Sequence, residues 1–253
     1  MEVHHHHSHP EGPGQSKKWT HYLWEFLMLF LAVTLGFFVE NQREHYVEHQ
    51  REKQFIRSLF RDIKTDTSNI IRIIEARTIR ERSLDSLTFM MNTTNPQNFI
   101  RKIYNNAIYA SRTLQYRFVP NDGTIQQLKN SGAFRLIRDR VVADSISQYD
   151  ISVRNFLGQY AVEENQIEHY RNASAKLFDA LVFDQMIDEN SFATREPKGD
   201  LHLQPYDKRE LYEWNYRIYG LKGINKANRR QLRSLLEQAT SLLELLKKEY
   251  HIE

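Results

Sequence analysis

Two histidines and a glutamate form the pattern His45-x-x-Glu48-His49, which resembles the motif of inverted zinc peptidases. Histidines four residues apart share one face of a helix, where both imidazoles can bind zinc while the glutamate acts as a general base. Such an enzyme also needs a third ligand and a concave site, and the neighbouring sequence is a charged run that offers neither. We therefore expect no catalysis here, and a zinc-dependent hydrolase is the less favoured alternative.

The first residues of the chain hold a second group of potential metal ligands. Imidazoles bind Ni²⁺, Zn²⁺ and Cu²⁺, but a flexible tail binds them weakly and unselectively. The chain contains no cysteine, which excludes disulfides and thiolate zinc sites. We expect a disordered polar tail over residues 1–18 with incidental metal affinity, and no cofactor. Its histidines are His4, His5, His6, His7 and His9.

Glu25 is the only charged residue of the apolar segment 22–39. A carboxylate within a membrane is a functional hypothesis by default, because it can accept a proton or pair with a basic residue of a partner helix. Glu25 lies only one turn from Tyr22, however. A carboxylate there can reach the polar interface, and a helix N-terminus stabilises its charge. We favour this second interpretation.

A glycine followed by basic residues marks a potential anion or partner contact at 131–138. Ser131 and Gly132 precede a helix that we expect to begin near residue 134, and Arg135 and Arg138 follow them. Backbone N–H groups at a helix N-terminus bind anions. Helix termination followed by a solvated basic face explains the same residues, and we prefer that interpretation.

An aromatic cluster occupies the segment 206–219, beside several basic residues. It can form a recognition surface, but aromatic residues at helical spacing are more often part of a core, which is what we expect. Its members are Tyr206, Tyr212, Trp214, Tyr216 and Tyr219.

The apolar segment 22–39 is the first of the elements that position these residues. At a rise of about 1.5 Å per residue it spans about 27 Å, close to the hydrocarbon thickness of a bilayer. Aromatic residues at its start suit the headgroup level. It is not followed by a small-residue cleavage site, so we predict an uncleaved transmembrane helix over 19–39 rather than a signal peptide or a buried core helix.

The orientation of the predicted anchor follows from its flanking charges. Lys17 and Lys18, with a short tail, favour a cytoplasmic N-terminus. Arg43 and Arg51 argue the other way, but they belong to a long domain, and long domains cross the membrane largely regardless of charge. We therefore expect the soluble domain outside the cytoplasm.

After the anchor the sequence predicts an all-α fold, in which the transmembrane helix continues into a long helix of an antiparallel helical bundle. No Gly or Pro occurs from residue 37 to residue 95, so one helix can extend to about residue 91. We expect its residues 40–54 to form a charged helical stalk. The bundle domain is predicted over 55–253. Its first apolar stripe has seven-residue spacing, interrupted by Arg77, and comprises Ile56, Ile63, Ile70, Leu84 and Met91.

Further helices are predicted from punctuation and periodicity. We expect them at about 96–117, in a short segment after residue 124, at 134–187, in an aromatic segment ending at Gly220, and at 225–250. The net charge of +3, with both signs interleaved, does not favour nucleic-acid binding.

Four stretches of the chain resemble an uncharacterised Bacteroidetes family of single-pass membrane proteins with an N-terminal anchor and a helical domain. They are MEVHHHHSH, WEFLMLFLAVTLGFFVENQRE, REKQFIRSLFRDIKTDT and, at 124–139, TIQQLKNSGAFRLIRD. The resemblance implies a Gram-negative host, an inner-membrane location and a native His-rich start. It implies no activity.

Together these features predict a non-enzymatic, membrane-anchored helical protein. We expect it to contact membrane lipid and to bind a protein partner or a second copy of itself. A helical domain on a single anchor is also typical of receptors, so a sensor-like ligand-binding domain is the alternative.

Overall fold

The computed structural model describes residues 17–188 and 194–252, and divides the chain into two compact units, residues 1–52 and 53–253. Helix α1 (Lys17–Met91) contributes to both units. Its sequence contains a single glycine, Gly36, and no proline, so nothing interrupts its backbone hydrogen bonds. The predicted continuation of one helix to about residue 91 is confirmed.

The first unit exposes an unbroken apolar helix surface. From Trp19 onward, α1 is long and apolar enough to cross a membrane, and none of its most apolar stretch is buried. Large side chains such as Phe26, Leu29 and Phe37 are each exposed by about two thirds or more, at 66%, 68% and 74%. Beyond this stretch Arg43 donates from Nε to Glu40 at 3.0 Å, one of the helix-surface pairs expected in a charged segment.

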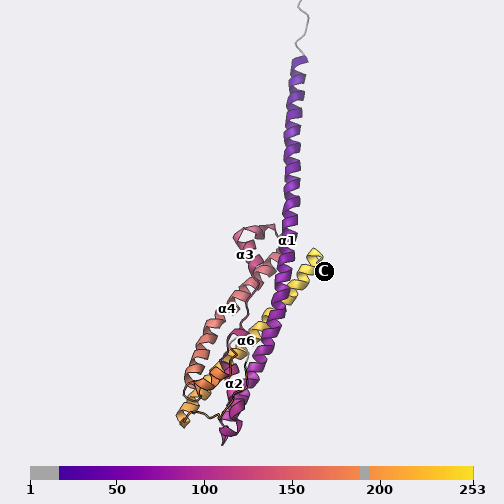
Figure 1. Ribbon diagram of the computed structural model, residues 1–253. Helices are drawn as coiled ribbons and strands as arrows, with labels where there is room; N and C mark the ends of the chain where they lie inside the picture. The colour runs from indigo at the N-terminus through magenta and orange to yellow at the C-terminus, as the bar shows by residue number, and fades with distance from the viewer. Residues whose placement is uncertain (1–16, 189–193, 253) are drawn as a thin grey trace, which may run out of the picture. The chain divides into compact units, whose positions relative to one another are not determined.

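Three long helices form the second unit: the later part of α1, α4 (Arg140–Ser174) and α6 (Lys208–Tyr250). Figure 1 shows them side by side. The Asp139 side chain caps α4 by accepting from the N–H groups of Val141 and Val142. A capping box starts α6, in which Asp207 and Glu210 each accept a hydrogen bond from the other's backbone N–H.

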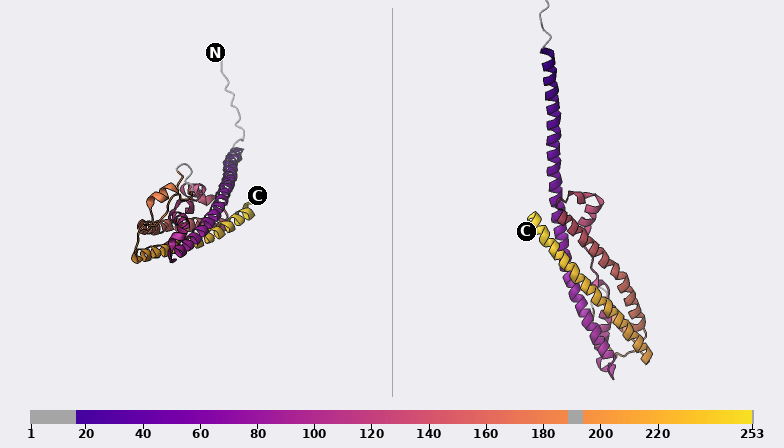
Figure 2. Two further views of the ribbon diagram at one scale, coloured as in Figure 1. Left: turned by 60° about the horizontal axis from the view of Figure 1, so that its bottom comes forward. Right: turned by 180° about the vertical axis from the view of Figure 1, so that it is seen from behind.

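The directions of these helices follow from their cross-contacts. Near the start of the bundle Tyr149 of α4 contacts Asp66 of α1, and further along Glu163 contacts Arg80, so α1 and α4 run in the same direction. Helix α6 is antiparallel to both, because its N-terminal Asn215 meets Asn92 at the end of α1. The two views in Figure 2 show the same arrangement.

A long connection makes the parallel pair possible by returning the chain from the end of α1 to the start of the bundle. This connection is largely helical. Elsewhere, between α5 and α6, an isolated bridge joins Ile187 to Thr194 and is the only β pairing among the described residues. The short elements are η1 (Pro96–Phe99), α2 (Ile100–Ser111), η2 (Leu114–Tyr116), α3 (Gly123–Asn130), η3 (Ala133–Leu136) and, after α4, α5 (Ala180–Gln185).

The structure corrects three predicted helix boundaries. Residues 134–187 form a 3-10 turn, α4 and α5, because Asp139 caps a new helix at Arg140 and α4 ends at Ser174. The helix predicted over 96–117 is limited to α2, flanked by 3-10 turns. The segments predicted on either side of Gly220 are one helix, α6, since burial along its whole length outweighs the unfavourable helix propensity of glycine.

The interior of the second unit consists of two apolar clusters. One includes Ile63 and Ile70 of α1 with Leu235 of α6, and the other includes Leu87 of α1 with Trp214 of α6. The stripes of the three long helices contribute to both, and residues of the shorter elements, such as Tyr104 of α2 and Leu128 of α3, complete them. Between the two clusters, on each of the three helices, the stripe positions are polar.

Candidate functional site: a buried charge network

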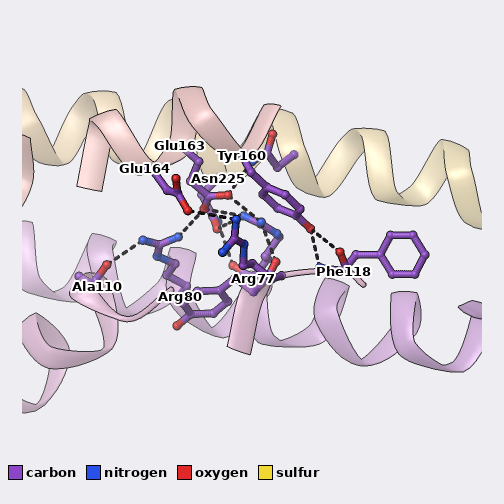
Figure 3. A network of polar contacts seen from close by, with 11 residues as sticks. Arg77, Arg80, Ala110, Phe118, Tyr160, Glu163, Glu164 and Asn225 are labelled. Atoms are coloured by element: carbon purple, nitrogen blue, oxygen red, sulfur yellow. Dashed lines mark hydrogen bonds and ion pairs between the residues drawn. The ribbon is translucent and has the colours of Figure 1, made fainter. Parts of the chain in front are cut away.

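Five polar side chains meet between the two apolar clusters, as Figure 3 shows in part. They come from all three long helices and are nearly inaccessible to solvent. The network comprises Arg77 and Arg80 of α1, Glu163 of α4, and Asn225 and Asn228 of α6, with exposed fractions of 0%, 0%, 4%, 0% and 0%.

The Glu163 carboxylate is the centre of this charge network. Its Oε1 accepts from Nη1 of Arg77 at 2.9 Å and from Nη1 of Arg80 at 2.7 Å. Its Oε2 accepts from Nη2 of Arg77 and from Nδ2 of Asn228, each at 2.8 Å. A carboxylate offers about four lone-pair sites, so these four donors fill it.

The two guanidinium groups also hold the returning connection in place. Nη2 of Arg77 donates to the carbonyl of Tyr116 at 2.8 Å, and Nη2 of Arg80 donates to the carbonyl of Ala110 at 2.7 Å. The guanidinium of Arg80 lies 4.5 Å from the centroid of the Tyr116 ring, a cation–π contact. Asn225 returns a hydrogen bond from Nδ2 to the Arg77 carbonyl at 3.0 Å. The charge network therefore joins four parts of the chain.

The electrostatics of the charge network keep its central carboxylate ionised. Burial alone would raise the pKa of Glu163, but the hydrogen bonds and charges of Arg77 and Arg80, with the Asn228 amide, lower it below its ordinary value. Burial lowers the pKa of Arg80, and the Glu163 charge opposes that effect. Two cations face one anion, so the charge network itself carries a net positive charge.

This arrangement suits a structural role better than a chemical one. A general base needs a free lone pair within reach of a substrate, and the donors on Glu163 already occupy its oxygens. The buried charges of α1 and α4, with the two asparagines of α6 at the same height, fix the axial register, because sliding one of these helices by a turn would leave an unpaired charge or amide in the core.

Sequence reasoning missed the charge network, although one signal was present. Arg77 interrupts the α1 stripe, which marks its position as unusual but does not name its partners. Glu163 lies seven residues after Phe156 and seven before Tyr170, both of which belong to the α4 stripe. Asn225 lies seven residues before Leu232 of the α6 stripe. Polar residues at stripe positions on three helices are the pattern that predicts a shared buried layer.

A second polar cluster joins the returning connection to α1. Asp66 accepts from the backbone N–H of Asn121 at 2.9 Å, from its side-chain amide at 2.8 Å, and from the Tyr149 hydroxyl at 3.2 Å. Burial raises the pKa of Asp66, and the Asn121 and Tyr149 hydrogen bonds partly offset this. Thr124 donates to Asp62 beside it. The cluster holds the start of α3 against the bundle.

The structure gives the proposed metal ligands other contacts. Nδ1 of His49 lies 3.0 Å from Oε2 of Glu52, one turn further along α1. Within residues 17–188 and 194–252, no three His, Asp or Glu side chains are grouped as a metal ion would require. The tail residues His4, His5, His6, His7 and His9 lie outside the described residues.

Glu25 lies beside another ionisable group. Nε2 of His21 is 3.3 Å from Oε1 of Glu25, one turn earlier in α1, and both side chains are more than half exposed. The carboxylate therefore lies within ion-pair distance of an imidazole on the tail side of the apolar stretch. The interpretation of Glu25 as an interfacial residue stays a prediction.

The segment predicted as an anion contact uses its backbone groups internally. The Ser131 N–H donates to the Gln127 carbonyl at 3.0 Å, and the Ala133 N–H donates to the Ser131 hydroxyl at 3.3 Å. Gly132 adopts a left-handed conformation (φ 68°) that ends α3. Arg135 and Arg138 are exposed but precede α4 rather than lying in it, so the expected helix N-terminus is not at these residues.

The aromatic cluster near the start of α6 divides between core and surface. Trp214 is fully buried and donates from Nε1 to the Ser174 hydroxyl at 3.0 Å, and Tyr206 is half-buried. The expectation of a core is wrong for Tyr212, Tyr216 and Tyr219, which are 66%, 68% and 75% exposed. They lie on the face of α6 opposite Trp214, because the helix is amphipathic there.

Comparison with protein-family models, with curated proteins and with solved structures finds no match to this chain. The class of this protein is therefore defined by its fold alone. This is an all-helical protein with one long apolar N-terminal helix of a kind that can cross a membrane, and a helical unit organised around buried charges.

Proposed function

We propose that this chain is a non-catalytic, single-pass membrane protein whose helical domain binds a protein partner or contributes to a membrane assembly. The observation that carries the proposal is the exposed apolar surface of α1 near its start, where large side chains have no contact that removes them from solvent. Such a surface is stable in lipid and unfavourable in water.

The use of the buried charges supports the non-catalytic part of the proposal. The Glu163 carboxylate and the two guanidinium groups around it are hydrogen-bonded to one another and to backbone carbonyls. These groups therefore stabilise the bundle and are not free to act on a substrate. A rigid helical bundle of this kind presents long, fixed faces to a partner.

For the location, we propose the inner membrane of a Gram-negative bacterium with the domain in the periplasm. The support is the resemblance to the Bacteroidetes family and the lysines before the anchor. Fusions of alkaline phosphatase or of a green fluorescent protein after Glu253 test the orientation. Active phosphatase without fluorescence is the expected result, and the opposite pair of results would place the domain in the cytoplasm.

Crosslinking in cells tests the partner-binding proposal. A membrane-permeant lysine crosslinker is applied to cells that produce the tagged full chain, and the adducts are identified by mass spectrometry. We expect adducts with one defined protein partner or with a second copy. A chain that stays at its own mass of 30.2 kDa throughout would contradict the proposal.

A sensor-like domain is the second candidate, favoured by two adjoining polar grooves between α4 and α6. They have volumes of 220 and 410 Å³ and share Ser234 and Gln238. The Oε1 atom of Gln238 is buried and accepts no hydrogen bond from a described residue. A thermal-shift screen of small polar metabolites with the full chain in detergent distinguishes the two functions, because only a sensor is stabilised by a ligand.

A further inference from the structure

One face of α6 carries a continuous row of exposed side chains, which we name the α6 strip. Its residues are spaced alternately by four and three, so they share one face of the helix along about 30 Å. The row has two chemically different halves. The aromatic half is Tyr212, Tyr216 and Tyr219, the basic half is Lys226, Arg230 and Arg233, and Gly223 lies between them.

The aromatic half of the α6 strip is exposed to an unusual degree for three consecutive turns of one helix. Each tyrosine is exposed by about two thirds or more, whereas Trp214 and Ile218 on the opposite face are buried. Tyrosine supplies a large contact area at low entropic cost and is enriched at protein interfaces. A row of three tyrosines is therefore better suited to a partner surface than to water.

The basic half belongs to a stretch of α6 without acidic residues. Between Glu213 and Glu237 the charged residues are all Lys or Arg. Glu81 of α1 faces this stretch and pairs with Arg229 at 2.9 Å and Lys226 at 3.4 Å. Neither Arg230 nor Arg233 forms an ion pair with a described residue. The positive charge of this half is thus only partly neutralised within the chain.

A shallow groove of 460 Å³ runs beside the basic half and is bounded by Glu81 of α1. Gly223 and Ala227 lie in its lining, where their small side chains leave room between the cations. A Cβ atom added at Gly223 would meet no other atom within 4 Å. Internal packing therefore does not require glycine at this position, although glycine weakens a helix interior.

We infer that the α6 strip docks a helix of a partner protein, which presents carboxylates to the basic half and apolar side chains to the tyrosines. The alternating spacing of four and three is that of a seam between two helices. Glycine in the middle of the seam allows close approach of the partner backbone. Charge complementarity then selects an acidic partner and fixes its register.

The two halves argue against one other occupant, a second copy packed in parallel. Two copies with their α6 helices parallel would place cations against cations, which is unfavourable. An anionic lipid surface matches the basic half and also accepts tyrosines at the headgroup level, so capture of lipid is the competing outcome of the test below. The inference rests on the proposed partner-binding function and names the surface and the chemistry of the partner.

Photo-crosslinking from defined positions tests the α6 strip in cells. A photoreactive amino acid is placed in the full chain at Tyr212, Tyr216 or Tyr219, and at Arg61 or Thr65 on the exposed face of α1 as controls. We expect adducts from the α6 positions to one other protein, with the attachment sites in an acidic helical segment. Adducts from the strip to lipid or to a second copy would overturn the inference.

Charge reversal then tests the chemistry. The triple variant Lys226→Glu, Arg230→Glu, Arg233→Glu should lower the yield of the adduct about tenfold or more, because like charges now face each other. Exchanging the partner's facing carboxylates for lysines should restore it. The matched variant Arg57→Glu, Arg61→Glu, Lys64→Glu makes the same charge change on α1 and should alter the yield by less than about twofold. Equal loss in both variants would overturn the inference.

The outcomes separate the two proposals. If a protein is captured from the α1 positions but not from α6, the α6 strip is wrong and the partner-binding function stands. If neither set of positions captures a protein, and the lysine crosslinker also gives no adduct, the partner-binding function itself is contradicted.

Discussion

Arg77 of α1 and Glu163 of α4 form a bidentate ion pair in the interior of the bundle, with N···O distances of 2.9 and 2.8 Å. Both side chains are almost completely buried, at 0% and 4% exposure. Residues so distant in sequence can pair in this way only when two helices are in one axial register. The pair therefore fixes the axial register of α1 against α4.

Removing the central carboxylate should destabilise the bundle strongly. We expect Glu163→Gln to lower the free energy of unfolding by about 3–5 kcal/mol, because two buried guanidinium groups lose their counter-ion. Denaturant unfolding of the full chain in detergent, followed by circular dichroism, measures the change. The adjacent Glu164 pairs with Arg117 on the surface, so Glu164→Gln should cost less than about 1 kcal/mol. Equal losses would contradict the structural role of the charge network.

The stability of the bundle should decrease in acid because of Glu163. Its pKa in the folded state is lowered from the ordinary 4.5, so the unfolded chain binds the proton more tightly. The stabilisation is fully present above the ordinary value and is lost as the pH falls through the folded value. Unfolding curves measured from neutral pH downward should show this loss in the wild type and a smaller one in Glu163→Gln.

Asp66 should have the opposite effect on how the stability of the bundle depends on pH. Burial raises its pKa, so the folded chain binds this proton more tightly, and its contribution to stability decreases as the pH rises through the folded value. Asp66→Asn should therefore make the loss of stability in acid steeper than in the wild type. A shallower acid limb in this variant would show that Asp66 is not the group with the raised pKa.

Replacing the whole ionic group should be less harmful than breaking it. We expect the triple variant Arg77→Met, Arg80→Met, Glu163→Leu to be more stable than Glu163→Gln by about 1–4 kcal/mol or more. The reason is that the triple variant leaves no unpaired charge in the core. The same denaturant measurement applies. If the triple variant were the less stable of the two, the hydrogen bonds to Tyr116 and Ala110 would outweigh the ionic terms.

The two glycines in the middle of α6 should respond differently to alanine. Gly223→Ala should stabilise the protein by up to about 1 kcal/mol, because the added methyl group meets no neighbour and alanine favours the helix. A Cβ at Gly220 would lie 2.5 Å from Oε1 of Gln166, so Gly220→Ala should gain less, since that side chain must move. Thermal unfolding of both variants measures the difference, and a larger gain at position 220 would contradict it.

Much of the fold was predictable because helical periodicity is a local signal. The continuity of α1 followed from the near absence of glycine and proline, and the apolar stripes correctly identified most of the core. The end of α4 and the unbroken course of α6 were not predictable in this way. They depend on Asp139 as a cap and on tertiary burial that overrides the propensity of Gly220.

The charge network was the least accessible feature, since it depends on which helices face each other. Taken alone, Arg77 is a single charged residue at an apolar stripe position, which does not predict a charge network. Only the parallel packing of α4 against α1 shows that Glu163 neutralises it, and only the antiparallel α6 brings Asn228 to the same carboxylate. The exposed side of α6 is hard to predict for a similar reason, because five aromatic residues in one segment do not show which of them face the core.

The mass of the protein extracted from its own membranes tests the central claim most directly. The full chain is solubilised in mild detergent without crosslinker, and its mass is measured by native mass spectrometry after the micelle is removed. A partner-binding membrane protein should give a complex heavier than the 30.2 kDa chain, and the Lys226→Glu, Arg230→Glu, Arg233→Glu variant should lose that partner. A chain that leaves the membrane in the soluble fraction, or that is strictly monomeric in the micelle, would contradict the account.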